Sequence, residues 1–101
     1  RFHPAYYAMS FARGARLRHE LYIDVGSAEA SQEVYDQLLQ ERSAIETAFG
    51  GPLEWEPLPD KSVCRIATYT DGEITQTSEH ERFVDWFIDT GDRLRRALGD
   101  A

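Results

Sequence analysis

Apolar and polar residues alternate from Arg16 to Val25, which is the two-residue period of a strand with one buried face. The preceding residues, from Ala5 to Arg13, are mostly small, aromatic or hydroxylated, and Gly14-Ala15 separates the two segments. Because glycine permits the positive φ of a tight turn, we predict a β-hairpin. The predicted buried face holds Leu17, His19, Leu21, Ile23 and Val25, and the predicted exposed face holds Arg16, Arg18, Glu20, Tyr22 and Asp24.

A helical period begins after Gly26. Spacings of four and seven residues place Val34, Leu38, Ile45 and Phe49 on one apolar stripe, so we predict a helix that ends at Phe49. The predicted N-cap is Ser27 or Ser31. Gly50 is suited to the left-handed conformation that commonly follows the end of a helix.

Two further strands are predicted in the second half of the chain. Residues 53–56 alternate, residues 62–70 are rich in β-branched and aromatic side chains, and Pro57, Pro59 and Asp60 indicate a turn between them. Residues 73–77 fit either a short strand or a loop.

A second helix is predicted from a capping box, in which Ser78 and Glu81 satisfy each other's backbone N–H groups. Gly91 interrupts this helix at a cost of about 1 kcal/mol relative to alanine. The predicted buried stripe consists of Phe83, Val84, Phe87, Ile88, Leu94 and Leu98.

The order β-β-α-β-β-α predicts an α+β fold. An antiparallel four-stranded sheet with both helices on one face would bury both apolar stripes in a two-layer sandwich. The length of 101 residues fits a single domain over residues 1–101. Since the sequence begins with Arg1 and not with methionine, we expect it to be a fragment of a longer chain.

Composition favours a cytoplasmic protein that does not enter a membrane. The chain has one cysteine, Cys64, whereas small secreted domains usually carry several disulfides. No apolar run approaches the ~20 residues that a membrane span needs, and the N-terminus lacks the pattern of a signal peptide.

The formal net charge of −7 opposes generic binding to nucleic acid. The charge is unevenly placed, however. Residues 1–25 carry four arginines and two acidic residues, whereas the remaining residues carry seven basic and sixteen acidic ones. The predicted hairpin is therefore locally basic, and its basic groups are arginines, which bind phosphate or carboxylate with two parallel hydrogen bonds.

Catalytic and metal-binding patterns are not found in the sequence. One cysteine and three separated histidines do not provide zinc-ligand spacing, and no glycine-rich phosphate loop is present. We predict no catalytic residue, no metal and no cofactor. Cys64 is more typical of a small buried residue than of a nucleophile, and Glu54 and Glu56 are more typical of a solvated strand face than of a cation site.

The hairpin carries the predicted binding residues, Arg13, Arg16, Arg18 and Tyr22. Arginine interleaved with tyrosine is suited to gripping phosphates and stacking on bases. The alternative is a solvated face on which Arg16 or Arg18 pairs with Glu20 of a neighbouring element.

A family resemblance rests on residues spread over nearly the whole chain. These residues are Glu20-Leu21-Tyr22-Ile23-Asp24, Tyr35-Asp36-Gln37-Leu38, Ile45-Glu46, Phe49-Gly50, Leu53-Glu54-Trp55-Glu56, Lys61 and Arg65-Ile66. In this order they resemble the bacterial family called domain of unknown function 4268.

The resemblance indicates the kind of larger protein in which the domain occurs, but it implies no catalytic activity. Domains of this family often lie at the C-terminus of larger proteins, some with nuclease regions or other restriction and phage-defence modules. We therefore expect a non-catalytic accessory domain whose partners are a nuclease domain in the same full-length chain and DNA or RNA. Two alternatives are a self-associating module, such as a homodimer, that uses Tyr22 and an uncovered strand edge, and a small-molecule-binding domain that uses tyrosines with Glu54 and Glu56.

Overall fold

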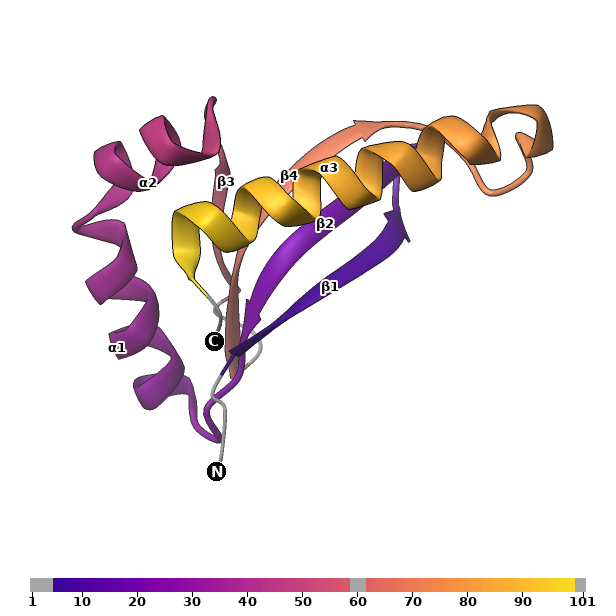
Figure 1. Ribbon diagram of the computed structural model, residues 1–101. Helices are drawn as coiled ribbons and strands as arrows, with labels where there is room; N and C mark the ends of the chain where they lie inside the picture. Colours follow the sequence, from indigo (N-terminus) through magenta and orange to yellow (C-terminus); the bar gives the residue numbers. More distant parts are fainter. Residues whose placement is uncertain (1–4, 59–61, 100–101) are drawn as a thin grey trace.

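Four antiparallel strands and three α-helices make up the described part of the chain, which comprises residues 5–58 and 62–99 of a computed structural model (Figure 1). This confirms the predicted α+β fold and its antiparallel four-stranded sheet. The predicted turn residues Pro59 and Asp60, and Lys61 beside them, lie outside the described residues.

The predicted hairpin is present. Strand β1 (Ala5–Ala12) pairs antiparallel with β2 (Arg16–Ile23). The turn between them has positive φ at Gly14 and Ala15, of 78° and 56°. Leu17 is fully buried, so the apolar face of β2 contributes to the core as the alternation predicts.

The predicted first helix is divided into α1 (Ala28–Leu39) and α2 (Arg42–Phe49). The chain tightens at the break, where the N–H of Glu41 bonds to the carbonyl of Leu38 at 2.9 Å. The break allows α1 to pack on the sheet while α2 packs against the last helix (Figure 1). Sequence periodicity did not reveal it, because both halves carry the same apolar stripe.

The predicted caps of this region are confirmed in part. The Ser27 hydroxyl accepts the N–H of Ala30 at 3.1 Å and is the N-cap of α1. Ser31, the alternative candidate, is buried and its hydroxyl donates to the carbonyl of Ser62 at 2.9 Å. Gly50 has φ of 97° and ends α2 in the left-handed conformation, as predicted.

The second strand pair consists of β3 (Glu54–Leu58) and β4 (Val63–Asp71). The strand order in the sheet is β1-β2-β4-β3, with every neighbouring pair antiparallel. Residues 73–76 form a loop, which resolves the open choice between strand and loop. The edges of the sheet are therefore β1 and β3.

The last helix, α3 (His80–Leu98), begins later than predicted. Ser78 lies in a short 3-10 turn (Thr77–Glu79), and the N-cap Glu79 makes no side-chain capping bond. The predicted capping box is therefore wrong. The carbonyl of Thr77 already accepts the N–H of His80, because the chain winds into the helix through this tighter turn.

The buried stripe of α3 is narrower than predicted. Phe83 and Leu94 are buried, but Val84 and Ile88 are exposed. The prediction for these two residues is wrong, because among the described residues no strand lies beyond β1 to cover them.

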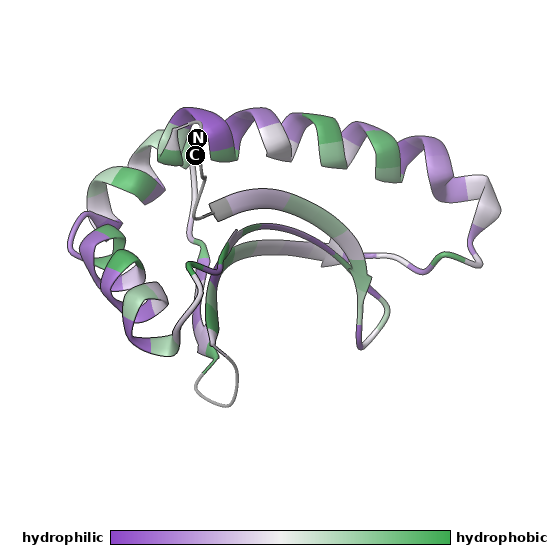
Figure 2. Cartoon of the chain, turned by 90° about the horizontal axis from the view of Figure 1, so that it is seen from below, coloured by the Kyte–Doolittle hydropathy of each residue, from purple (hydrophilic) through white to green (hydrophobic). Residues whose placement is uncertain are grey.

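The helices lie on one side of a curved sheet. Figure 2 shows an arched sheet with the helices on its convex side, and the uncovered side is here called the concave face. This is the predicted two-layer arrangement. Within the described residues, no helix is long and apolar enough to cross a membrane. A single core cluster joins strands and helices and contains Leu21, Ile23, Tyr35, Ile45, Phe49, Leu53, Cys64, Ile66 and Leu94.

Candidate functional site

Three of the four predicted binding residues lie together at one end of the concave face. Arg16 and Arg18 extend from β2, and Arg13 lies in the hairpin turn. They border a polar hollow of about 570 Å³ on the concave face. The pairing of β2 with β4, and of β4 with β3, brings further polar side chains to this hollow, namely Arg65, Tyr69 and Glu56.

A buried carboxylate organises the centre of this face. The Glu20 side chain is only 4% exposed, and its Oε2 lies 2.8 Å from Arg18 Nε and its Oε1 3.5 Å from an Arg65 guanidinium nitrogen. Its direct neighbours on the adjacent strands are Ala8 and Ala67. These small neighbours leave room for the two arginine side chains, which compensate the buried charge.

The sequence predicted Glu20 on a solvated face, and that expectation of exposure is wrong. The alternation placed the residue on the correct side of the strand. Glu20 is buried because β1 and β4 flank β2 and because the side chains of Arg18 and Arg65 cover it on the concave face. The anticipated Arg–Glu pair does form, but Arg18 and Glu20 belong to the same strand.

Glu56 links β3 to β4 across the hollow. Its Oε1 lies 2.6 Å from Arg65 Nε, and its Oε2 accepts the Tyr69 hydroxyl at 2.8 Å. Burial alone lowers the pKa of Arg65, but the hydrogen bond and charge of Glu56 outweigh it and the pKa is raised. Burial, followed by the same carboxylate, raises the pKa of Tyr69. Arg65 therefore stays charged and Tyr69 neutral.

Arg13 and Arg16 form the cationic rim of the hollow. Both are exposed, and within residues 5–58 and 62–99 neither forms an ion pair. The Arg16 guanidinium carbon lies 4.1 Å from the centre of the Tyr69 ring, and Arg16 Nε donates to the carbonyl of Arg13 at 3.2 Å. These contacts orient Arg16 while leaving its charge uncompensated.

Tyr22, the fourth predicted residue, lies at the other end of β2 and does not line the hollow. It pairs with Tyr6 of β1, whose ring centre is 5.3 Å away. Burial and then the neighbouring Tyr6 raise the pKa of Tyr22, which keeps the hydroxyl neutral. The concave face thus has an arginine end and a tyrosine end.

The residues of this face that sequence reasoning missed as binding residues are Tyr6, Arg65 and Tyr69, whereas Glu56 was named only for the small-molecule-binding alternative. Each lies on a predicted strand, but only the pairing register places it beside β2. The available signal was the alternation within each strand, which assigns a face but does not identify the neighbours.

The other candidate residues do not assemble a reactive centre. Cys64 is buried, its Sγ lies 3.8 Å from Gln32 Oε1, and burial raises the pKa of its thiol. Glu54 is exposed, and Glu56 lies on the concave face, away from the helices. Among the described residues, no group of three or more histidine, cysteine or acidic side chains is arranged to hold a metal ion.

Comparison with known proteins identifies a family. The family model described as domain of unknown function (DUF4268) matches residues 3–101, which is nearly the whole chain. Searches of curated proteins and of solved structures found no match.

Proposed function

Because the chain belongs to the family described as domain of unknown function (DUF4268), we propose that it is a non-catalytic accessory domain of a bacterial restriction or phage-defence nuclease protein. In this role the concave face helps the protein engage single-stranded nucleic acid. The setting is supported by the context that the family resemblance implies. The role is supported by the arginine and tyrosine side chains of the concave face.

The cationic rim carries the proposal. Arg18 and Arg65 are neutralised by Glu20 and Glu56, whereas Arg13 and Arg16 remain exposed at the border of the hollow. A guanidinium group that forms no ion pair among the described residues keeps its charge available for a phosphate, which arginine binds with two parallel hydrogen bonds. The contact of Arg16 with Tyr69 reduces the entropy that phosphate binding would cost.

The tyrosine end supplies the second contact. Tyr6 is more than half exposed and lies against Tyr22. Stacking of a base on an aromatic side chain contributes about 1–3 kcal/mol and does not depend on base identity. The strand rise places Tyr22 about 20 Å from Arg16, which leaves room for a few nucleotides between the two ends.

The overall charge limits the strength of this binding. At −7, the protein repels polyanions at long range. Charges in physiological salt act over about 8 Å, so the rim attracts a phosphate only after close approach. We therefore expect weak, salt-sensitive binding that gains strength when the domain is joined to a nuclease region.

The test measures fluorescence anisotropy of short labelled single-stranded DNA and RNA across a salt series. The double variant Arg13→Ala/Arg16→Ala should bind more weakly, and its salt slope should fall by about 1.4, because two phosphate contacts are lost from a single strand. Tyr22→Ala should weaken binding while leaving the salt slope unchanged.

The matched control removes the same charge from α3 through Arg82→Ala/Arg96→Ala. Both residues are exposed and lie outside the concave hollow. This control should bind like the wild-type protein. Equal losses in the two double variants, or no loss in the first, would show that the concave face is not the site.

A further inference from the structure

The two edges of the sheet differ in how they are protected against pairing with another strand. The edge strand β3 has five residues and carries Glu54, Glu56 and Pro57. Charges, proline and short length all hinder the addition of a strand. The edge strand β1 has eight residues and contains no charged residue, proline or glycine. Of the two edges, β1 is the one suited to accept another strand.

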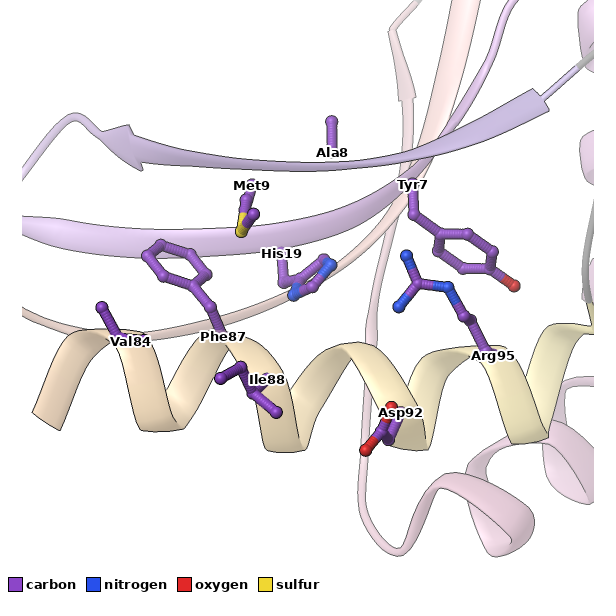
Figure 3. Close-up of a pocket in the computed structure, with 9 residues that line it drawn as sticks. All are labelled: Tyr7, Ala8, Met9, His19, Val84, Phe87, Ile88, Asp92 and Arg95. Carbon is purple, nitrogen blue, oxygen red and sulfur yellow. The ribbon is translucent and has the colours of Figure 1, made fainter. Parts of the chain in front are cut away.

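An apolar groove lies beside this unprotected edge, between β1 and α3, and is here called the β1–α3 groove. It has a volume of about 410 Å³. Figure 3 shows Met9 of β1 facing Val84, Phe87 and Ile88 of α3 across it. Met9 is 63% exposed, Val84 54% and Ile88 61%. Apolar side chains grouped in this way beside a free strand edge are typical of an interface.

We infer that the β1 edge and the β1–α3 groove form the interface at which two copies of this chain pair. The two β1 strands would run antiparallel about a two-fold axis at Met9. In this register Met9 faces Met9 of the other copy, and Tyr7 faces its Phe11. Large side chains meet on the helix side, while Ala8 faces Ser10 on the concave side. The strand is thus complementary to itself, as a two-fold interface requires.

The helix layer agrees with this axis. Phe11 packs against Phe83, with ring centres 6.0 Å apart, and the Arg95 guanidinium lies 4.8 Å from the ring centre of Tyr7. Helix α3 therefore runs opposite to β1, with Ile88 near the level of Met9. An axis at Met9 also passes near Ile88 and brings the two α3 helices together antiparallel.

The charges of α3 favour a second copy of this chain, rather than another apolar partner, as the occupant of the β1–α3 groove. Glu81 and Arg95 each lie seven residues from Ile88, on the same face of α3. An antiparallel α3 pair centred on Ile88 places Glu81 of one copy opposite Arg95 of the other. Both side chains are exposed, and among the described residues neither forms an ion pair.

The position of α3 above the sheet fixes the distance between the two helices in such a pair. Side chains of α3 contact both β1 and β2, for example through Phe87, which packs on Phe11 and His19. Paired β1 strands lie about 4.8 Å apart. Helix α3 lies over β2, so the two α3 helices would lie about 14 Å apart across the axis, and the side chains of the β1–α3 groove of both copies lie between them.

The test is sedimentation velocity from low micromolar to several hundred micromolar protein. The wild-type chain should form a dimer as concentration rises. Met9→Lys and Ile88→Lys should each weaken dimerisation at least about tenfold, because they place a charge in the apolar contact. Both residues lie on the helix side of the sheet, so the concave face remains intact in these variants.

The matched control is Ile74→Lys. Ile74 is 63% exposed, like Met9, but lies in the loop after β4 and outside the groove. This variant should dimerise like the wild-type chain. A wild-type chain that stays monomeric throughout, or a dimer that tolerates both groove substitutions, overturns the inference.

A charge exchange tests the proposed two-fold axis. Glu81→Arg and Arg95→Glu should each weaken the dimer, because like charges then face each other. The double variant should recover most of the lost affinity, because the pair is restored with reversed signs. Circular dichroism verifies that each variant is folded. No recovery in a folded double variant rejects this antiparallel arrangement.

Discussion

His19 explains why α3 carries a glycine in its middle. The ring lies buried between β2 and α3, and a Cβ added at Gly91 would come within 2.7 Å of His19 Cε1. Glycine costs the helix about 1 kcal/mol relative to alanine. Overpacking a filled interior costs about 1–3 kcal/mol. The close approach of the ring therefore outweighs the helix propensity, although the sequence shows only the propensity cost.

His19 also makes stability depend on pH. Burial, and then the nearby Arg95 charge, lower the pKa of His19 below 6.5. The unfolded chain therefore binds a proton in the window just below 6.5 where the folded chain does not. Stability is full above this window and falls as the pH drops, by at most about 1.4 kcal/mol per pH unit.

The measurement is urea unfolding at several pH values between about 7 and 5. His19→Gln should flatten the pH dependence, because the titrating ring is removed. The control is His80→Gln, which removes an exposed imidazole that lies outside the core. An unchanged slope in His19→Gln would assign the pH dependence to other groups.

At the scale of the elements, Glu46 joins α2 to β3. Its Oε2 accepts the backbone N–H of Leu53 at 2.8 Å and the indole N–H of Trp55 at 3.1 Å. The hydrogen bond from Leu53, followed by that from Trp55, lowers the pKa of Glu46. The Glu46 carboxylate thus fixes the start of β3 against α2.

Glu46→Ala should therefore lower the free energy of unfolding by about 1 kcal/mol near neutral pH, because two donors lose a charged acceptor. Because the pKa of Glu46 is lowered from 4.5, this contribution to stability is present above pH 4.5. It is lost as the pH falls through the pKa that Glu46 has in the folded state. Urea unfolding at neutral and acidic pH measures both effects.

The control for this contact is Glu33→Ala, which removes an exposed carboxylate from α1. Its effect on the free energy of unfolding should stay within about 0.5 kcal/mol. Equal effects of the two substitutions, or a Glu46→Ala effect that does not shrink in acid, would contradict the assigned role.

At the scale of the whole molecule, one core unites all three helices with strands from both halves of the sheet. We therefore predict a single cooperative unfolding transition. Trp55 reports on β3, and Trp86 reports on α3, where it packs against Phe87. The single-tryptophan variants Trp55→Phe and Trp86→Phe should each show a fluorescence transition that coincides with the loss of helical circular dichroism. Separate midpoints within one variant would indicate two units.

Pairing of two copies through β1 would also extend the concave face. The two-fold axis keeps both helix layers on one side, so the two cationic rims would lie on the same side of one continuous sheet. The proposed nucleic-acid role and the proposed dimer remain separable, because their test variants lie on opposite faces.

The sequence by itself determined the local elements. The alternation along Arg16–Ile23, a serine cap at Ser27 or Ser31 and the glycine after Phe49 act through backbone geometry and through neighbours within four residues. These features therefore survive in the fold. The order of elements then predicted a two-layer domain, because apolar faces of this size must cover one another.

Only the tertiary structure decided which residues of these elements contact one another and which stay exposed. Glu20 is buried because alanines on two other strands leave space for the arginines that cover it. Ile88 is exposed because the sheet ends at β1 and not one strand further. Both outcomes depend on strand order and register, which pair residues far apart in the chain and leave no periodic signal in one sequence.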